Sequence, residues 1–218
     1  MRILLTGFEP FGGDSVNPSW LVAQQLEGMS FAGAQVQAVQ LPCVFGISAQ
    51  VLLQALAQHQ PDVVLALGLA QGREGISIER VAINVDDARM ADNAGRQPID
   101  TPVVPGGPAA YFSTLPIKRL AQGLQQAGHP AHISQTAGTF VCNHVFYALQ
   151  HHLLGQHVMS GFVHLPALPE QADRAPDPRP PHMALSDQVA AVQKLLQLCV
   201  AHASQREGDV RVSGGANH

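Results

Sequence analysis

The chain has 218 residues, of which 46% are hydrophobic and 13% are charged, and its formal net charge is −4 at pH 7. This length and apolar content suit one compact domain with its own core, and the slightly acidic balance argues against the basic surface that nucleic-acid binding requires. No apolar run reaches the roughly 18 residues of a membrane-spanning helix, and the low charge content favours a surface partly covered in a homo-oligomer.

Strands and helices alternate along the chain, because apolar runs or two-residue alternation give way to helical periodicity and back again. In chain order we expect a strand over 2–7, a helix over 19–29 with Ser19 as its N-cap, a strand over 34–42, a helix over 48–60, strands over 62–70 and 76–85, a helix over 115–128, a strand over 131–138, a helix within 136–154, a strand over 158–168 and a helix over 186–203. This order predicts a single-domain three-layer αβα sandwich, with a twisted, mostly parallel sheet and helices on both faces.

Two segments are too rich in Gly, Pro and polar residues to be regular elements, namely 86–110 and 170–183. A loop as long as the first is usually functional or disordered. After residue 203 the chain is polar and Gly-rich, so we expect one domain over 1–203 and a flexible tail over 204–218.

Three cysteines, Cys43, Cys142 and Cys199, lie far apart without a CxxC pair. An odd number at such spacing argues against a disulfide framework and a zinc site. The N-terminal MRILLTGFEPFGG lacks the long apolar region and the cleavage site of a signal peptide. We therefore expect a cytoplasmic protein that needs no metal.

Functional groups in such folds lie on loops beyond the strand ends. Neither a GK[ST] phosphate loop nor GxGxxG is present, so nothing beyond the fold class supports nucleotide binding. His144 and His151 share a helix face but lack the carboxylate of an HExxH motif, so a metal site is not supported either.

Cys142 follows a Gly-containing turn and lies in the first turn of a predicted helix. Free cysteine is most often a small buried hydrophobe, but the free N–H groups and the dipole at a helix start stabilise a thiolate and an oxyanion. His164 ends the apolar run GFVHLP and Glu79 is an acid in an apolar strand, so the three could form a nucleophile, a base and an orienting acid. Spacing alone fits a core histidine, and an ion pair of Glu79 with Arg80 or Arg89, equally well.

Several motifs occur in a characteristic order: TGFEPFGG, GLAQGR, ISIERVAIN, DDARMADN, GGPAAYFSTLPIK, SQTAGTFVCN and GFVHLPALPEQ. Over residues 1–171 the chain resembles the type I pyroglutamyl peptidase family, also called pyrrolidone-carboxylate peptidases, and SIERVAIN and AGTFVCN are its most specific blocks. Members are cysteine peptidases that remove an N-terminal pyroglutamyl residue from peptides. The resemblance implies the same reaction here through a thioester acyl-enzyme, without a cofactor.

The resemblance also implies residue roles. Cys142 would be the nucleophile, His164 the base and acid, and Glu79 the residue that orients His164, while Arg89 and the Cys142 backbone N–H would hold the oxyanion. The substrate slot would be formed by Phe8, Phe11, Asn17, Gln71, Met90, Phe140 and Val141, with the amides of Asn17 and Gln71 as polar contacts. Cys43 stands where many members have a small hydroxyl residue, and members are commonly tetramers.

Pyroglutamate is a neutral five-membered lactam, which calls for an apolar slot with a few aimed hydrogen bonds. Proline has the same ring without the lactam carbonyl, so it should be a poor substrate. Two other functions stay open from the sequence: another small-amide cysteine hydrolase with the same triad, and a non-catalytic ligand-binding module of the same fold.

Overall fold

The computed structural model describes residues 1–175, 177–205 and 208–215. Its centre is a seven-stranded sheet in the order β2-β3-β1-β4-β9-β5-β8. These strands are β1 (Arg2–Phe8), β2 (Ser30–Phe31), β3 (Ala34–Leu41), β4 (Val63–Leu69), β5 (Ile76–Glu79), β8 (Ala131–Ser134) and β9 (Met159–Leu165). The helices are α1 (Pro18–Leu26), α2 (Ile47–His59), α3 (Ile117–Gln126), α4 (Val141–His152), α5 (Pro169–Ala172) and α6 (Leu185–Gln205).

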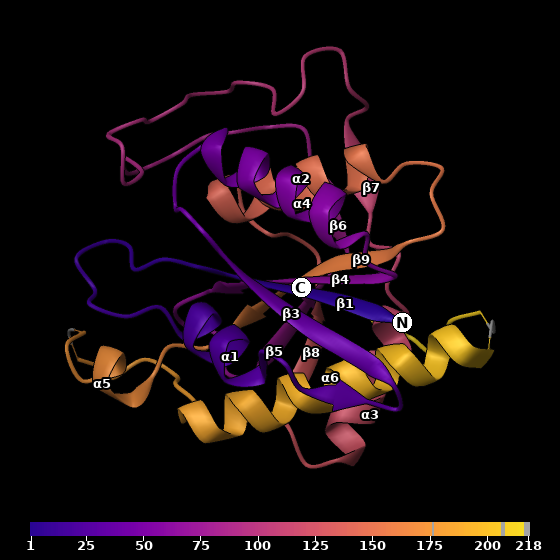
Figure 1. Cartoon of the computed structure of the whole chain (residues 1–218). Coiled ribbons are helices and arrows are strands. Elements are labelled where there is room, and N and C mark those ends of the chain that lie inside the picture. The colour runs from indigo at the N-terminus through magenta and orange to yellow at the C-terminus, as the bar shows by residue number, and fades with distance from the viewer. Residues whose placement is uncertain (176, 206–207, 216–218) are drawn as a thin grey trace.

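Three layers are stacked in the molecule (Figure 1). Helices α2 and α4 cover one face of the sheet, and α1, α3 and α6 cover the other. Within this seven-stranded sheet, four strand pairs are parallel, and two, β2 with β3 and β5 with β9, are antiparallel. The predicted α/β sandwich with a mostly parallel sheet is therefore confirmed. In the described part of the chain, no helix is both long and apolar enough to cross a membrane.

Each strand sends alternate side chains to the two faces, as the two-residue period of a strand requires. In β1, Ile3 and Leu5 pack with α1, α3 and α6, whereas Leu4 packs with α2 and α4. Central strands such as Val63–Leu69 are apolar on both faces because both faces are covered. Full burial of one such Leu or Val side chain contributes about 1.5–3 kcal/mol relative to its exposure.

The predicted strand over 76–85 is wrong in one respect, because it divides after Glu79. Its first half is β5, and its second half is β6 (Val81–Ile83), which pairs with β7 (Ala110–Phe112) in a separate two-stranded sheet. Arg80 lies at the division: its backbone N–H donates to Ser134 and its carbonyl accepts from Ser113. Because Arg80 bonds to two different segments, the chain leaves the main sheet directly after Glu79.

Other differences concern short elements and helix ends. The N-cap of α1 is Asn17 rather than Ser19, since the Asn17 side chain accepts the Ser19 N–H and Pro18 occupies the first helical position. The short strands β2 and β7 and the single-turn helix α5 were not predicted. Elements of two to four residues are defined by their partners, so a sequence pattern gives little sign of them.

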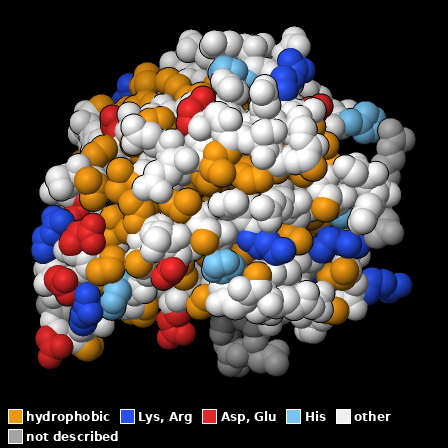
Figure 2. All heavy atoms as spheres, turned by 60° about the horizontal axis from the view of Figure 1, so that its bottom comes forward, with side chains coloured by type: hydrophobic (Ala, Val, Ile, Leu, Met, Phe, Trp, Pro, Cys, Tyr) orange, Lys and Arg blue, Asp and Glu red, His pale blue; other side chains and the backbone are white. Residues whose placement is uncertain are grey.

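The chain after α6 returns to α3. The Asp209 carboxylate accepts the backbone N–H groups of Lys118 and Arg119, which satisfies donors in the first turn of α3. The Gly214 carbonyl accepts from Arg80 and Gln135 near the ends of β5 and β8. A flexible tail from residue 204 stays a prediction. Figure 2 shows charged side chains scattered among hydrophobic and uncharged ones on one face of the molecule.

Candidate active site

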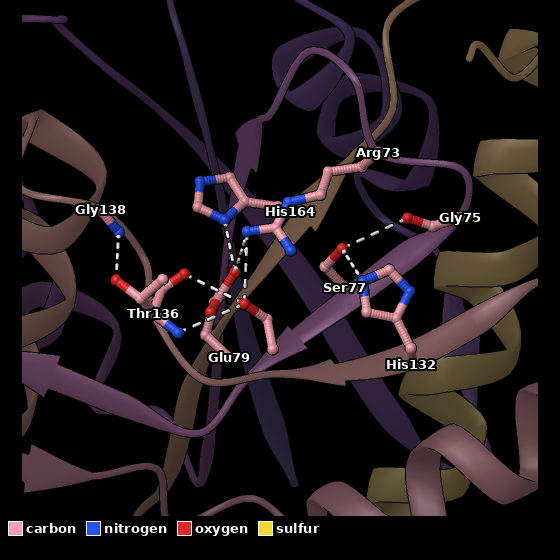
Figure 3. A network of polar contacts seen from close by, with 9 residues as sticks. Arg73, Gly75, Ser77, Glu79, His132, Thr136, Gly138 and His164 are labelled. Carbon is pink, nitrogen blue, oxygen red and sulfur yellow. Dashed lines mark hydrogen bonds and ion pairs between the residues drawn. The ribbon is translucent and has the colours of Figure 1, made fainter. Parts of the chain in front are cut away.

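Glu79 and His164 form a buried pair on the sheet face that α4 covers. His164 Nδ1 lies 2.7 Å from Glu79 Oε1, and the two residues are 4% and 0% exposed. Strands β5 and β9 are antiparallel with Ser77 opposite His164, so Glu79 falls opposite Phe162 and diagonal to His164 on the same face. The two side chains point toward each other in Figure 3. This arrangement fixes the imidazole with its other nitrogen, Nε2, directed away from the carboxylate.

Cys142 occupies the first turn of α4, as the sequence predicts. The N-cap residue Phe140 provides no side-chain acceptor for the helix start, so the first backbone N–H groups of α4 keep their donor capacity. The Cys142 sulfur lies 3.0 Å from the position that a Cβ on Gly68 would take. Gly68 pairs with His164 across β4 and β9, and paired residues share a sheet face about 5 Å apart. The structure thus places the Cys142 sulfur beside Gly68, the residue that pairs with His164 on the neighbouring strand.

Burial raises the pKa of the Cys142 thiol above its ordinary value; the neighbouring Cys43 and Glu79 raise it further, while a hydrogen bond from the Cys142 backbone lowers it. The direction is opposite to the thiolate stabilisation that the helix start suggests from sequence. Desolvation of the sulfur outweighs the effect of the helix end. A thiol whose pKa is raised needs a neighbouring base to become a nucleophile.

Gly68 is required by this packing. An added Cβ would lie 2.8 Å from the Phe162 ring and 3.0 Å from the Cys142 sulfur. We expect Gly68→Ala to displace the sulfur and to lower kcat/KM by up to about 10²-fold, because small misplacements of reacting groups are costly. The control is Gly208→Ala, which adds its methyl group to open space. Steady-state kinetics and thermal unfolding would check this, and unchanged kinetics in Gly68→Ala would contradict it.

Aromatic rings gather in the apolar cluster that also contains Cys142. The Phe140 ring lies 5.0 Å from Phe11 and 5.2 Å from Phe45 between centroids, and Phe45 also meets the His144 ring edge-on. Phe11 and Phe140 were predicted as slot residues and lie side by side. Phe45 was missed, because its segment VFG carries no chemical motif and only its packing on Phe140 reveals it.

Two carboxylates, the buried Asp92 and the partly exposed Glu9, tie three loops together around these rings. Asp92 accepts the backbone N–H groups of Phe45, Ala94 and Arg96. Glu9 accepts the Cys43 N–H and the Asn93 side-chain amide. The long 86–110 segment is therefore joined to the loops after β1 and β3.

The other predicted slot residues differ in how available they are. Phe8 is buried against Phe162, and Val141 is fully buried. Asn17 is buried, and its amide donates to the Glu9 carbonyl and accepts from Ser19. Gln71 is exposed in the turn after β4, and Met90 is 54% exposed.

Arg89 is an exposed residue of the long loop. Two residues before it, Asp87 exchanges hydrogen bonds with Thr139, the residue that precedes Phe140. This connection holds the backbone near Arg89 beside the start of α4. Its predicted role at the oxyanion stays a prediction.

A second histidine–carboxylate pair includes His144, which lies two residues after Cys142 on α4. His144 Nδ1 lies 2.8 Å from Asp86, and its Nε2 accepts the Gly46 backbone N–H at 3.0 Å. Nε2 must be unprotonated to accept, so Nδ1 carries the proton and donates to Asp86. Both ring nitrogens are thus occupied by structural bonds. Among the described residues, the structure has no group of three or more His, Cys, Asp or Glu side chains that could hold a metal ion.

Comparison with known proteins identifies similar chains. The model of the family described as pyroglutamyl peptidase matches residues 1–202. The pyrrolidone-carboxylate peptidase of Klebsiella pneumoniae (strain 342) is 55% identical over 217 residues, which cover 99% of each chain. The solved structure of pyroglutamyl peptidase I from Bacillus amyloliquefaciens is 41% identical with a TM-score of 0.91, over 97% of this chain and 99% of that one. A mutant pyrrolidone carboxyl peptidase from Pyrococcus furiosus is 43% identical with a TM-score of 0.90, over 93% and 100%.

Proposed function

The chain belongs to the pyroglutamyl peptidase family, and from this membership we propose that Cys142, His164 and Glu79 carry out its reaction. That reaction is the hydrolytic removal of an N-terminal pyroglutamyl residue from peptides by a cysteine peptidase. The observation that supports these roles best is the buried Glu79–His164 hydrogen bond beside the helix start that bears Cys142. It supplies an oriented base next to a thiol.

The first step forms the acyl-enzyme. His164 Nε2 takes the proton of the Cys142 thiol while the sulfur attacks the pyroglutamyl carbonyl carbon. The S–C bond forms as the carbonyl π electrons move to oxygen. Glu79 accepts the Nδ1–H bond throughout, which holds the ring in place and stabilises the imidazolium.

The second step releases the products. The imidazolium gives its proton to the departing amine as the C–N bond breaks, which leaves a thioester on Cys142. His164 then takes a proton from water, whose oxygen attacks the thioester. The C–S bond breaks, the proton returns to sulfur, and free pyroglutamate leaves.

The oxyanion needs donors at the start of α4. The Cys142 backbone N–H is one, since the first N–H groups of a helix have no intrahelical acceptor. Arg89 is the second by family resemblance, and the Asp87–Thr139 hydrogen bonds support its approach. A guanidinium at this place would neutralise the developing charge.

Specificity for pyroglutamate fits the aromatic surroundings. Phe11, Phe140 and Phe45 offer flat apolar surfaces to a neutral ring. A site built to bond the lactam N–H and C=O rejects a ring that lacks one of them, because its own polar groups would lose their partners.

A pair of reporter substrates tests the proposal. We expect the protein to hydrolyse a pyroglutamyl-amide reporter at least about 10⁴-fold faster than the matching prolyl-amide reporter. Comparable rates on both would indicate a general small-amide cysteine hydrolase. Hydrolysis of neither would indicate a non-catalytic binding module.

Assembly and location are also proposals. We expect a homo-oligomer, a tetramer by family resemblance, and the exposed Phe112 and Ile99 side chains, at 72% and 74%, suit a partly covered surface. The three described cysteines are free thiols, which suits the cytoplasmic location expected from sequence.

A further inference from the structure

Glu79 has an unusual charge balance for a buried acid. It is 0% exposed, and its Oε1 accepts the His164 Nδ1–H. Its other oxygen, Oε2, is buried with no hydrogen-bond partner among the residues that the structure describes. A neutral imidazole donates a proton but brings no charge, so a buried carboxylate in this place needs a nearby cation to stay ionised.

Arg73 brings that cation. It lies on the turn between β4 and β5, and its Nη2 is 3.9 Å from Glu79 Oε1. Of the ion pairs between described residues, Glu79 takes part in two, one with His164 and one with Arg73. The Arg73 side chain is 31% exposed, so its own charge stays partly solvated while its field reaches the buried acid.

Ser134 fixes the guanidinium in this position. Arg73 Nη2 donates to Ser134 Oγ at 3.3 Å, and Ser134 Oγ donates its single proton to the Thr136 carbonyl at 3.0 Å. The hydroxyl proton is therefore used, and its oxygen is left as the acceptor for arginine. Figure 3 shows the guanidinium extending from the turn toward Glu79 and His164.

We propose that Arg73 is a positioning residue for the Glu79–His164 pair, and that its charge sets how far down the pH scale His164 remains a neutral base. The inference rests on the proposed catalytic roles of Glu79 and His164. Arg73 offsets the carboxylate, so the imidazolium is less strongly stabilised at rest. His164 then accepts a proton from the thiol and still releases it to the leaving amine.

Other titratable groups near the pair are few. His132 lies on β8 and bonds Ser77 Oγ at 2.9 Å rather than the acid. Burial lowers the pKa of His132, Arg73 lowers it further, and Glu79 and Glu74 act in the opposite direction. Cys142 and Cys43 on the side of α4 are neutral thiols, since burial raises their pKa values. Among the described residues, Arg73 is the cation that an ion pair joins to Glu79, and it also lowers the pKa of His132.

The test is the pH profile of kcat/KM for a pyroglutamyl-amide reporter in the wild type and in Arg73→Gln. The variant keeps an amide donor but loses the charge. Protonation of His164 then becomes easier, so the acidic limb should move upward by about half to one pH unit, after allowance for solvent screening. Activity just below the wild-type midpoint should fall several-fold, while activity on the alkaline side changes less.

Matched variants separate charge from shape. Arg73→Lys keeps the charge and should leave the acidic limb close to its wild-type position. Arg2→Gln removes an exposed guanidinium at the N-terminal end of β1, away from the Glu79–His164 pair, and should leave the pH profile unchanged. An unmoved acidic limb in Arg73→Gln, with or without a uniform loss of rate, overturns the proposal because it reduces Arg73 to a structural part.

An NMR titration of the His164 ring gives a readout that needs no turnover. In a Cys142→Ala background, adding Arg73→Gln should raise the ring's titration midpoint, and an equal midpoint overturns the proposal. A different result would refute the proposed function, namely persistent hydrolysis by the Cys142→Ala variant. If Arg73→Gln does not fold, high salt should move the wild-type midpoint upward by screening the partly exposed cation, and a salt-independent midpoint overturns the proposal.

Discussion

Replacing Cys142 with alanine should lower kcat/KM for pyroglutamyl-amide hydrolysis by about 10⁴-fold or more, because without the sulfur no thioester can form. The remaining oxyanion donors and the substrate slot supply only residual catalysis. Steady-state kinetics at several enzyme concentrations would measure the loss. Substrate affinity should change little, since the sulfur reacts with the carbonyl carbon and does not hold the ring.

The other two cysteines provide the comparison. Cys199 is a fully buried residue of α6, on the opposite face of the sheet, so Cys199→Ala should cost stability but not kcat. Cys43 shares the apolar cluster beside Cys142, and Cys43→Ala should act through packing of the slot. Retention of wild-type activity in Cys142→Ala would refute the nucleophile assignment.

Exchanging Glu79 for glutamine should reduce kcat by about 10²- to 10⁴-fold while the fold is retained. The amide is close in size but neutral, so it neither fixes the Nδ1–H tautomer of His164 nor stabilises the imidazolium that forms when the thiol is deprotonated. Burial raises the pKa of the Cys142 thiol, so its deprotonation depends on a correctly oriented base. Rate constants and circular dichroism would be measured together.

The second histidine–carboxylate pair is the matched control. Asp86 bonds His144, whose Nε2 accepts the Gly46 N–H and so anchors the loop that carries Phe45. Asp86→Asn should therefore affect KM and thermal stability more than kcat. A larger kcat loss in Asp86→Asn than in Glu79→Gln would reverse the roles assigned to the two pairs.

Most of the sheet and its helices could be predicted from the sequence, because both rest on local periodicity. Val63–Leu69 is apolar throughout, and the amphipathic pattern after residue 185 gives α6. The division after Glu79 could not be predicted, since Arg80 is held by Ser134 and Ser113 from distant segments. The antiparallel course of β5 beside β9 likewise depends on tertiary pairing.

Sequence motifs singled out Cys142, His164 and Glu79, but the contacts among them came from the fold. Nothing in the spacing shows that Glu79 meets His164 diagonally across two strands. Phe45 lies outside the quoted motifs, and Arg73 ends the motif GLAQGR, whose spacing assigns it no partner. Packing on Phe140 and the ion pair with Glu79 reveal these two residues. The helix start suggested a stabilised thiolate, whereas burial of the sulfur raises its pKa, because desolvation depends on neighbours that the local sequence does not name.

The covalent step can be tested directly by quenching the reaction in acid and measuring the mass of the intact protein by mass spectrometry. During turnover of an activated pyroglutamyl ester, we predict a mass increase of one pyroglutamyl group per chain, which peptide mapping places on Cys142 and which alkali or hydroxylamine removes. Turnover with no such adduct, or an adduct carried by another residue, would contradict the account.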